Sequence, residues 1–122
     1  MSGATLGTGA DASLHRGLRV AVVLPCYRVR DAILDVIAGI PPWVSMIHVV
    51  DDGCPEGSGR LVQSSCLDPR VIVHFNPANQ GVGGAVITGY RAAMDAGADV
   101  IVKMDGDGQM DPAALRRLIR PI

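Results

Sequence analysis

The chain is poor in aromatic side chains, in excess charge of either sign and in long apolar runs. Aromatic residues make up 3% of its 122 residues, and 11 basic groups nearly balance 12 acidic ones. Nucleic-acid binding depends on basic surfaces and aromatic stacking, so the composition argues against a nucleic-acid partner. The longest apolar run, over residues 20–26, is far shorter than the roughly 18 residues of a membrane-spanning helix.

Cysteine is also scarce, with three residues and no Cys-x-x-Cys pair. An odd number at this spacing indicates neither a disulfide framework nor a zinc ribbon, and we expect a cytoplasmic protein. Residues 1–18 are rich in small residues and lack the apolar core of a signal peptide. We therefore expect a flexible tail over 1–18 and one domain over 19–122.

Runs of β-branched residues alternate with segments of helical spacing. Strands are predicted at 19–24, 46–50, 71–75 and 100–104, and helices at 31–40, 60–66, 83–96 and 112–119. Pro25 should end the first strand, Ser58 should cap the second helix, and Val86, Tyr90 and Ala93 should share one face of the third helix. This alternation predicts an α/β fold with a Rossmann-like, doubly wound, mostly parallel sheet that ends after the fourth strand and its helix.

Carboxylates follow two of the predicted strands. Asp51 and Asp52 end the second strand, and Asp105 and Asp107 end the fourth. Ligands of doubly wound sheets bind outside the carboxyl ends of the strands, so we expect a ligand site there. The second acidic pair offers oxygen ligands for a divalent cation that could bridge to a diphosphate. A solvated turn is the alternative without function.

Other interpretations of these residues differ in strength. A calcium loop starting at Asp105 fails, because its sixth and twelfth places hold Met110 and Arg116 where Gly and Glu are needed. Asp51 and Asp52 suit either a helix cap or a hydrogen bond to the base or ribose of a nucleotide.

The glycine-rich segment 81–85 opens a predicted helix and suits either an anion or close packing on the sheet. It lacks a third fingerprint glycine, since Val86 stands there. The three histidines form no ligand set, and we expect His48 and His74 to be structural residues with satisfied hydrogen bonds. No residue stands out as a covalent nucleophile.

Four segments together, at 22–27, 49–53, 79–85 and 103–112, resemble the motifs of family 2 glycosyltransferases of the GT-A fold. Within this family the chain is similar to dolichol-phosphate mannosyl and glucosyl synthases. The residues that the resemblance implies for the nucleotide-sugar site are Pro25, Tyr27, Asp52, Gly81, Gly84 and Asp105. Those implied for a Mg²⁺ or Mn²⁺ site are Asp105, Asp107 and Gln109.

The resemblance implies metal-dependent, inverting transfer of a hexose from a UDP- or GDP-sugar to a polyprenyl-phosphate or glycan acceptor. The family usually has Asn-Glu after the tyrosine and Ser after Asp-Asp-Gly, whereas this chain has Arg28, Val29 and Cys54. These departures leave the nucleobase open.

The sequence ends at Ile122, where the family continues into the acceptor half and its catalytic base. The resemblance therefore implies a base that lies beyond Ile122, and no residue of this chain is assigned to that role. The alternative is a truncated, non-catalytic fragment that binds nucleotide and metal, or a regulatory or structural module. We expect the surface left by truncation to allow self-association, and a full-length relative to lie at the cytoplasmic face of the membrane.

Overall fold

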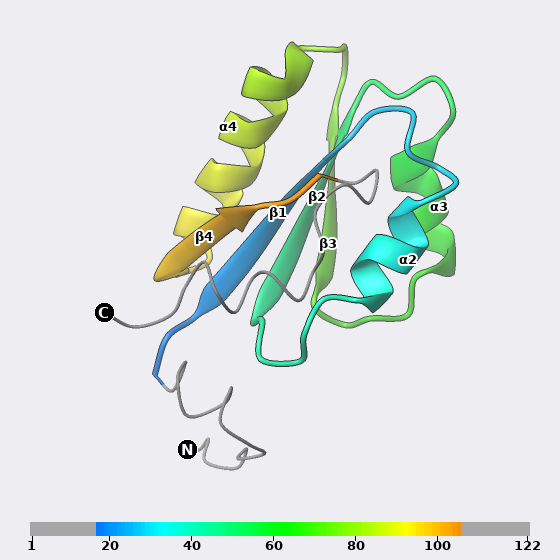
Figure 1. Cartoon of the computed structure of the whole chain (residues 1–122). Coiled ribbons are helices and arrows are strands. Elements are labelled where there is room, and N and C mark those ends of the chain that lie inside the picture. The colour runs from blue at the N-terminus through cyan, green and yellow to red at the C-terminus, as the bar shows by residue number, and fades with distance from the viewer. Residues whose placement is uncertain (1–16, 106–122) are drawn as a thin grey trace.

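The computed structural model describes residues 17–105 (Figure 1). The elements in chain order are β1 (Val20–Cys26), α2 (Ile33–Ala38), β2 (Met46–Asp52), α3 (Ser58–Ser65), β3 (Val71–Asn76), α4 (Gly81–Asp95) and β4 (Val100–Lys103). The strands form one parallel sheet in the order β3-β2-β1-β4, which confirms the predicted α/β fold. Most of the expected tail and the helix expected at 112–119 lie outside the described residues.

Helices cover both faces of this sheet: α2 and α3 one, α4 the other (Figure 1). Successive residues of β1 alternate between the faces, so Ala21 packs with Ala93 of α4, while Val22 packs in the larger core with Ile37 of α2. β2 is buried along its whole length. This burial explains why the residues before Asp51 are apolar except for His48, as is typical of a parallel strand covered on both faces.

Small residues bring α4 close to the sheet. Its buried positions include Ala85, Gly89 and Ala93, and a Cβ at Gly89 would lie 2.3 Å from Cγ1 of Val23. The face that the sequence predicts for Val86, Tyr90 and Ala93 is only partly covered by the sheet, because Ala93 is buried and Tyr90 is 37% exposed. An aromatic ring on the inner face would hold the helix away from β1, whereas glycine permits direct contact.

Pro25 does not end β1, which continues to Cys26. The carbonyl of Val23 accepts the Met104 N–H at 2.9 Å, so the backbone groups of residues 23 and 25 face the β4 side. β4 ends at Lys103. The nitrogen of Pro25, which carries no hydrogen, therefore faces a position past the last residue of β4. The proline thus removes no hydrogen bond from the sheet.

None of the helices within residues 17–105 has the length and apolar character needed to cross a bilayer.

Candidate functional site

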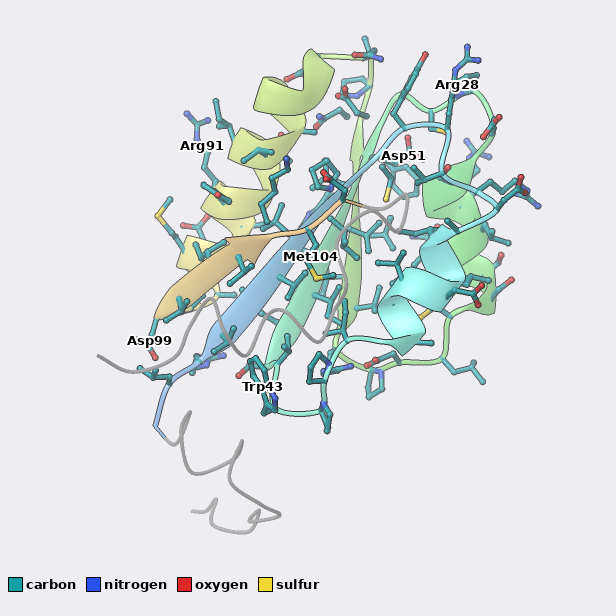
Figure 2. The ribbon with its side chains drawn as sticks, in the orientation of Figure 1. Arg28, Trp43, Asp51, Arg91, Asp99 and Met104 are labelled. Carbon is teal, nitrogen blue, oxygen red and sulfur yellow. The ribbon has the colours of Figure 1, made fainter. Side chains whose placement is uncertain are left out.

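The strand order reverses next to β1. The chain runs from β1 outward through β2 to β3, then crosses through α4 to place β4 on the other side of β1. Because all four strands are parallel, their carboxyl ends share one edge, where Pro25, Tyr27, Asp52 and Asp105 are found. Figure 2 shows Arg28 and Asp51 at this edge as well. The structure thus gathers the predicted site residues that lie within the described range at the edge where such sheets bind ligands.

Asp51 anchors the start of α3. Its side chain is 4% exposed, Oδ1 accepts the Cys54 N–H and Oδ2 accepts the Gly59 N–H, each at 2.8 Å. A Cβ at Gly59 would lie 2.6 Å from the carboxylate, so glycine is needed there for this contact. Ser58 is not the cap that the sequence predicted, because its Oγ accepts the Val29 N–H instead. The N-cap residue of α3 is Gly57, and Asp51 accepts a hydrogen bond from the first turn of α3 from its place in β2, so both of its oxygens are occupied by the fold.

Asp52 turns the opposite way and belongs to a second network. It is 3% exposed, and its Oδ1 accepts Nδ2 of Asn76 at 3.0 Å and the Gln80 N–H at 2.9 Å. Oδ1 of Asn76 in turn accepts the Thr88 hydroxyl at 3.2 Å. Sequence reasoning missed Asn76 and Thr88. The available signal was that Asn76 ends β3 as Asp52 ends β2, and the two residues are register partners.

Gly53 lets the loop after β3 approach the end of β2. Its φ is +70°, and a Cβ would lie 2.8 Å from the backbone nitrogen of Asn79. The Asn79 side chain accepts the Gly81 N–H at 2.7 Å and so shapes the entry to α4. The glycine of the Asp-Asp-Gly motif is therefore required both by its left-handed backbone and by this close approach.

The glycine-rich start of α4 has an open surface. A Cβ at Gly81 or Gly83 would meet nothing within 4 Å, whereas a Cβ at Gly84 would lie 2.6 Å from Cβ of Gln80. The closest packing on the sheet is at Gly89, although Ala85 at the end of this segment is also buried. Anion contact at this helix end stays a prediction for Gly81 and Gly84, and the Gly81 N–H already donates to the Asn79 side chain.

The loops after β1 and β2 are bonded to each other. The Arg28 N–H donates to Sγ of Cys54 at 3.1 Å, and Cys54 Sγ also lies 3.1 Å from the Ser58 hydroxyl. Arg28 has a φ of +58°, and its guanidinium carbon lies 5.4 Å from the ring centroid of Tyr27. The Tyr27 side chain is 41% exposed, so this rigid pair of loops presents an aromatic ring at the edge.

The two thiols beside these loops differ in their chemistry. Burial raises the pKa of Cys26, as do the neighbouring Asp51 and Cys54, which keeps this thiol neutral. Burial also raises the pKa of Cys54, but hydrogen bonds from Ser58, Arg28 and Glu56 outweigh it and lower the pKa. Cys54 is thus an acceptor that joins the two loops.

Asp105 lies just beyond β4, where Nζ of Lys103 is 3.3 Å from its Oδ1. Its side chain is 44% exposed, and carboxylate oxygens are ligands that Mg²⁺ and Mn²⁺ accept. Asp107 and Gln109, the other two residues of the predicted metal set, lie outside the described residues. Between residues 17 and 105, no group of three or more His, Cys, Asp or Glu side chains is arranged to hold a metal.

The catalytic base is not placed by the structure. The sequence predicts it beyond Ile122, and Ile122 itself already lies outside the described residues 17–105. The position of the base therefore stays a prediction.

The histidines of β2 and β3 pair with each other away from this edge. Nδ1 of His48 lies 2.9 Å from Nε2 of His74, and the rings stack with centroids 5.2 Å apart. Burial lowers the pKa of both, and His74 adds to the effect on His48. The prediction that both histidines have all their hydrogen bonds satisfied is wrong at one atom, because the buried Nε2 of His48 has no hydrogen-bond partner among the described residues.

Comparison with known proteins identifies the family. The family model described as glycosyl transferase family 2 matches residues 21–122. The chain belongs to glycosyl transferase family 2. This family 2 chain is 34% identical to the polyprenol monophosphomannose synthase of Mycolicibacterium smegmatis over 118 residues, 93% of the chain and 44% of the relative. It is 33% identical to the undecaprenyl-phosphate mannosyltransferase of Micrococcus luteus over 117 residues, 86% of the chain and 44% of the relative. The family 2 chain thus spans less than half the length of these relatives.

Solved structures share the fold of this family 2 chain. Mannosyl-3-phosphoglycerate synthase from Rubrobacter xylanophilus superposes with a TM-score of 0.64 at 25% identity, over 80% of the chain and 34% of that structure. Glucosyl-3-phosphoglycerate synthase from Mycobacterium tuberculosis, solved with Mn²⁺, UDP and glucosyl-3-phosphoglycerate, gives 0.61 at 22% identity, over 79% and 36%. These likenesses confirm the GT-A fold.

Proposed function

We propose that the chain is the donor-binding half of a glycosyltransferase that moves a hexose from a UDP- or GDP-sugar to a polyprenyl-phosphate or glycan acceptor. One observation carries the proposal: Tyr27, Asp52 and Asp105 lie at the carboxyl ends of three neighbouring parallel strands, beside the strand-order reversal. The two bacterial relatives support the acceptor class and the hexose through their names.

Different residues at this edge bind different parts of the donor in this proposal. The exposed ring of Tyr27, next to Pro25, is placed to contact the base. Asp52 accepts a hydrogen bond from the base or the ribose. The first turn of α4, which carries Gly81 and Gly84, offers the positive end of the helix dipole to the diphosphate.

A divalent cation fits the oxygen chemistry of Asp105, and Asp107 and Gln109 would complete its ligands. When bound, Mg²⁺ or Mn²⁺ supplies positive charge that neutralises the diphosphate and the leaving nucleoside diphosphate. The Lys103 ammonium holds Asp105 from one side, so the chain carries a positive charge at the same place. Inverting transfer needs a base for the acceptor, and no described residue is assigned to it.

A second candidate function is donor binding without transfer. The chain spans 44% of its two bacterial relatives, and the residues at this edge are those expected to hold nucleotide and metal. For a full-length protein we propose action at the cytoplasmic face of the membrane, where a polyprenyl-phosphate acceptor resides.

Thermal unfolding with ligands tests donor binding. We expect GDP, UDP or one of their sugars to raise the Tm with Mn²⁺ present, because a ligand at 100 times its Kd adds about 2.7 kcal/mol. Absence of any metal-dependent shift with all four ligands would overturn the proposal.

The metal site is tested by Asp107→Ala, which we expect to abolish the metal-dependent part of that shift. Asp95→Ala, at an exposed position of α4, is the matched control and should keep it. A full shift in the Asp107 variant would refute its ligand role. Transfer of labelled sugar to a polyprenyl phosphate separates the first candidate function from the second.

A further inference from the structure

We infer that Asn76 and Thr88 are positioning residues that hold Asp52 with Oδ1 occupied and Oδ2 presented to the donor nucleotide. The inference rests on the proposed function, because it concerns how that site is prepared for its ligand. The three residues come from the ends of two neighbouring strands and from the second turn of α4.

The hydrogen bonds fix the orientation of the Asn76 amide. The Asp52 carboxylate only accepts, so the NH₂ group of Asn76 must face it, at 3.0 Å. The amide oxygen then faces the Thr88 hydroxyl, 3.2 Å away. A flipped amide would set oxygen against carboxylate oxygen. The Thr88 proton also lies within reach of the Gly84 carbonyl, at 3.1 Å, so this hydroxyl ties the amide to the first turn of α4.

The network determines which oxygen is available to a ligand. Both hydrogen bonds found on the Asp52 carboxylate within residues 17–105 end on Oδ1, one from Asn76 and one from the Gln80 N–H. Asp51 differs, because each of its oxygens already accepts a backbone N–H. Of the two adjacent aspartates, only Asp52 thus has an oxygen left for a ligand.

This arrangement prepares the site before the nucleotide arrives. Asp52 and Asn76 are 3% and 8% exposed, so their side chains are enclosed by the fold as well as hydrogen-bonded. A side chain that is already ordered loses little conformational freedom on binding, which increases affinity. A carboxylate oxygen in this state accepts a strong, charge-assisted hydrogen bond from one hydroxyl or N–H of the ligand.

Thr88 offers a matched pair of variants. Thr88→Val removes the hydroxyl with little change in volume, and Thr88→Ser keeps the hydroxyl. With GDP and UDP as probes in the presence of Mn²⁺, we expect Thr88→Val to weaken binding several-fold and Thr88→Ser to stay near wild type. Urea unfolding of each variant shows whether it is folded under the binding conditions. Equal affinity of the Val and Ser variants would overturn the role of Thr88.

Asn76→Asp should make the nucleotide Kd depend on pH, which a purely structural role of Asn76 would not predict. It places two carboxylates in contact, and such a pair retains one shared proton in weak acid but repels when both groups ionise. We expect the ratio of variant to wild-type Kd to be about tenfold or more near pH 8 and to fall towards one near pH 5.

The outcomes separate this inference from the proposed function. Failure of the wild-type chain to bind either nucleotide would overturn both. Wild-type affinity in Asn76→Asp at all pH values would overturn the positioning role alone. The same holds if the variant loses stability while its Kd and pH profile match the wild type.

Discussion

Asp51→Asn tests whether the first aspartate of the Asp-Asp-Gly motif serves the fold. In the wild type, both carboxylate oxygens accept backbone N–H groups, from Cys54 and Gly59, at 2.8 Å. Asparagine keeps one acceptor oxygen and turns the other into an NH₂ group that faces an N–H. One backbone donor therefore loses its acceptor, and the remaining bond loses its charge.

The magnitude follows from these two bonds. A hydrogen bond to a charged group contributes about 1.5–3 kcal/mol, and an unsatisfied buried donor costs about 1–3 kcal/mol. With one bond lost and the other weakened, we expect the free energy of unfolding to fall by about 3 kcal/mol. In a domain of this size that corresponds to a drop in Tm of roughly 12–24 °C.

Urea unfolding followed by circular dichroism measures this loss. Asp35→Asn is the matched control, because Asp35 is exposed in the first turn of α2 and losing its charge there should cost less than about 1 kcal/mol. We expect Asp51→Asn to keep its nucleotide affinity wherever it is folded. A stability within about 0.5 kcal/mol of the wild type would refute the assigned anchoring role.

Three further perturbations probe the packing and the histidine pair. Gly53→Ala should destabilise the chain more than Gly17→Ala, since φ is positive at both but only the Gly53 Cβ meets backbone, 2.8 Å away; equal urea midpoints would contradict this. Gly89→Ala should cost roughly 1–3 kcal/mol by overpacking against β1, despite the better helix propensity of alanine; a gain in stability would refute the contact. The lowered pKa values of His48 and His74 predict that their contribution to the free energy of unfolding is full above about pH 6.5 and is lost as the pH falls through the folded pKa values. Replacing both histidines with Gln should flatten this dependence of stability on pH. An unchanged profile in urea unfolding would contradict the prediction.

The sequence was sufficient for the fold because its strongest signals are local. The apolar runs of β1 and β2 and the helical spacing after them predict a covered parallel sheet directly. The position at which β1 ends could not be predicted from the local sequence. Whether Pro25 breaks the strand depends on where β4 stops, and that is known only once the sheet order is known.

The roles of the two aspartates could not be separated from the sequence. Adjacent strand residues face opposite sides, so Asp51 faces α3 and Asp52 faces α4. Which helix covers which side follows from the topology, not from the motif. Asn76 and Thr88 reach Asp52 only through the register of β2 with β3 and the close approach of α4. The metal ligands Asp107 and Gln109, and a base beyond residue 122, stay predictions.

The hydrogen bond between Arg28 and Cys54 has a consequence for engineering. These positions are among those where the chain departs from the residues usual in its family, and the structure places them in contact at 3.1 Å. Grafting a relative's loop after β1 alone would separate the Cys54 sulfur from its donor. Grafting the loop after β2 alone would remove the acceptor of a residue held at a φ of +58°. The two loops therefore form a single structural unit, and a loop exchange between family members should transplant both together.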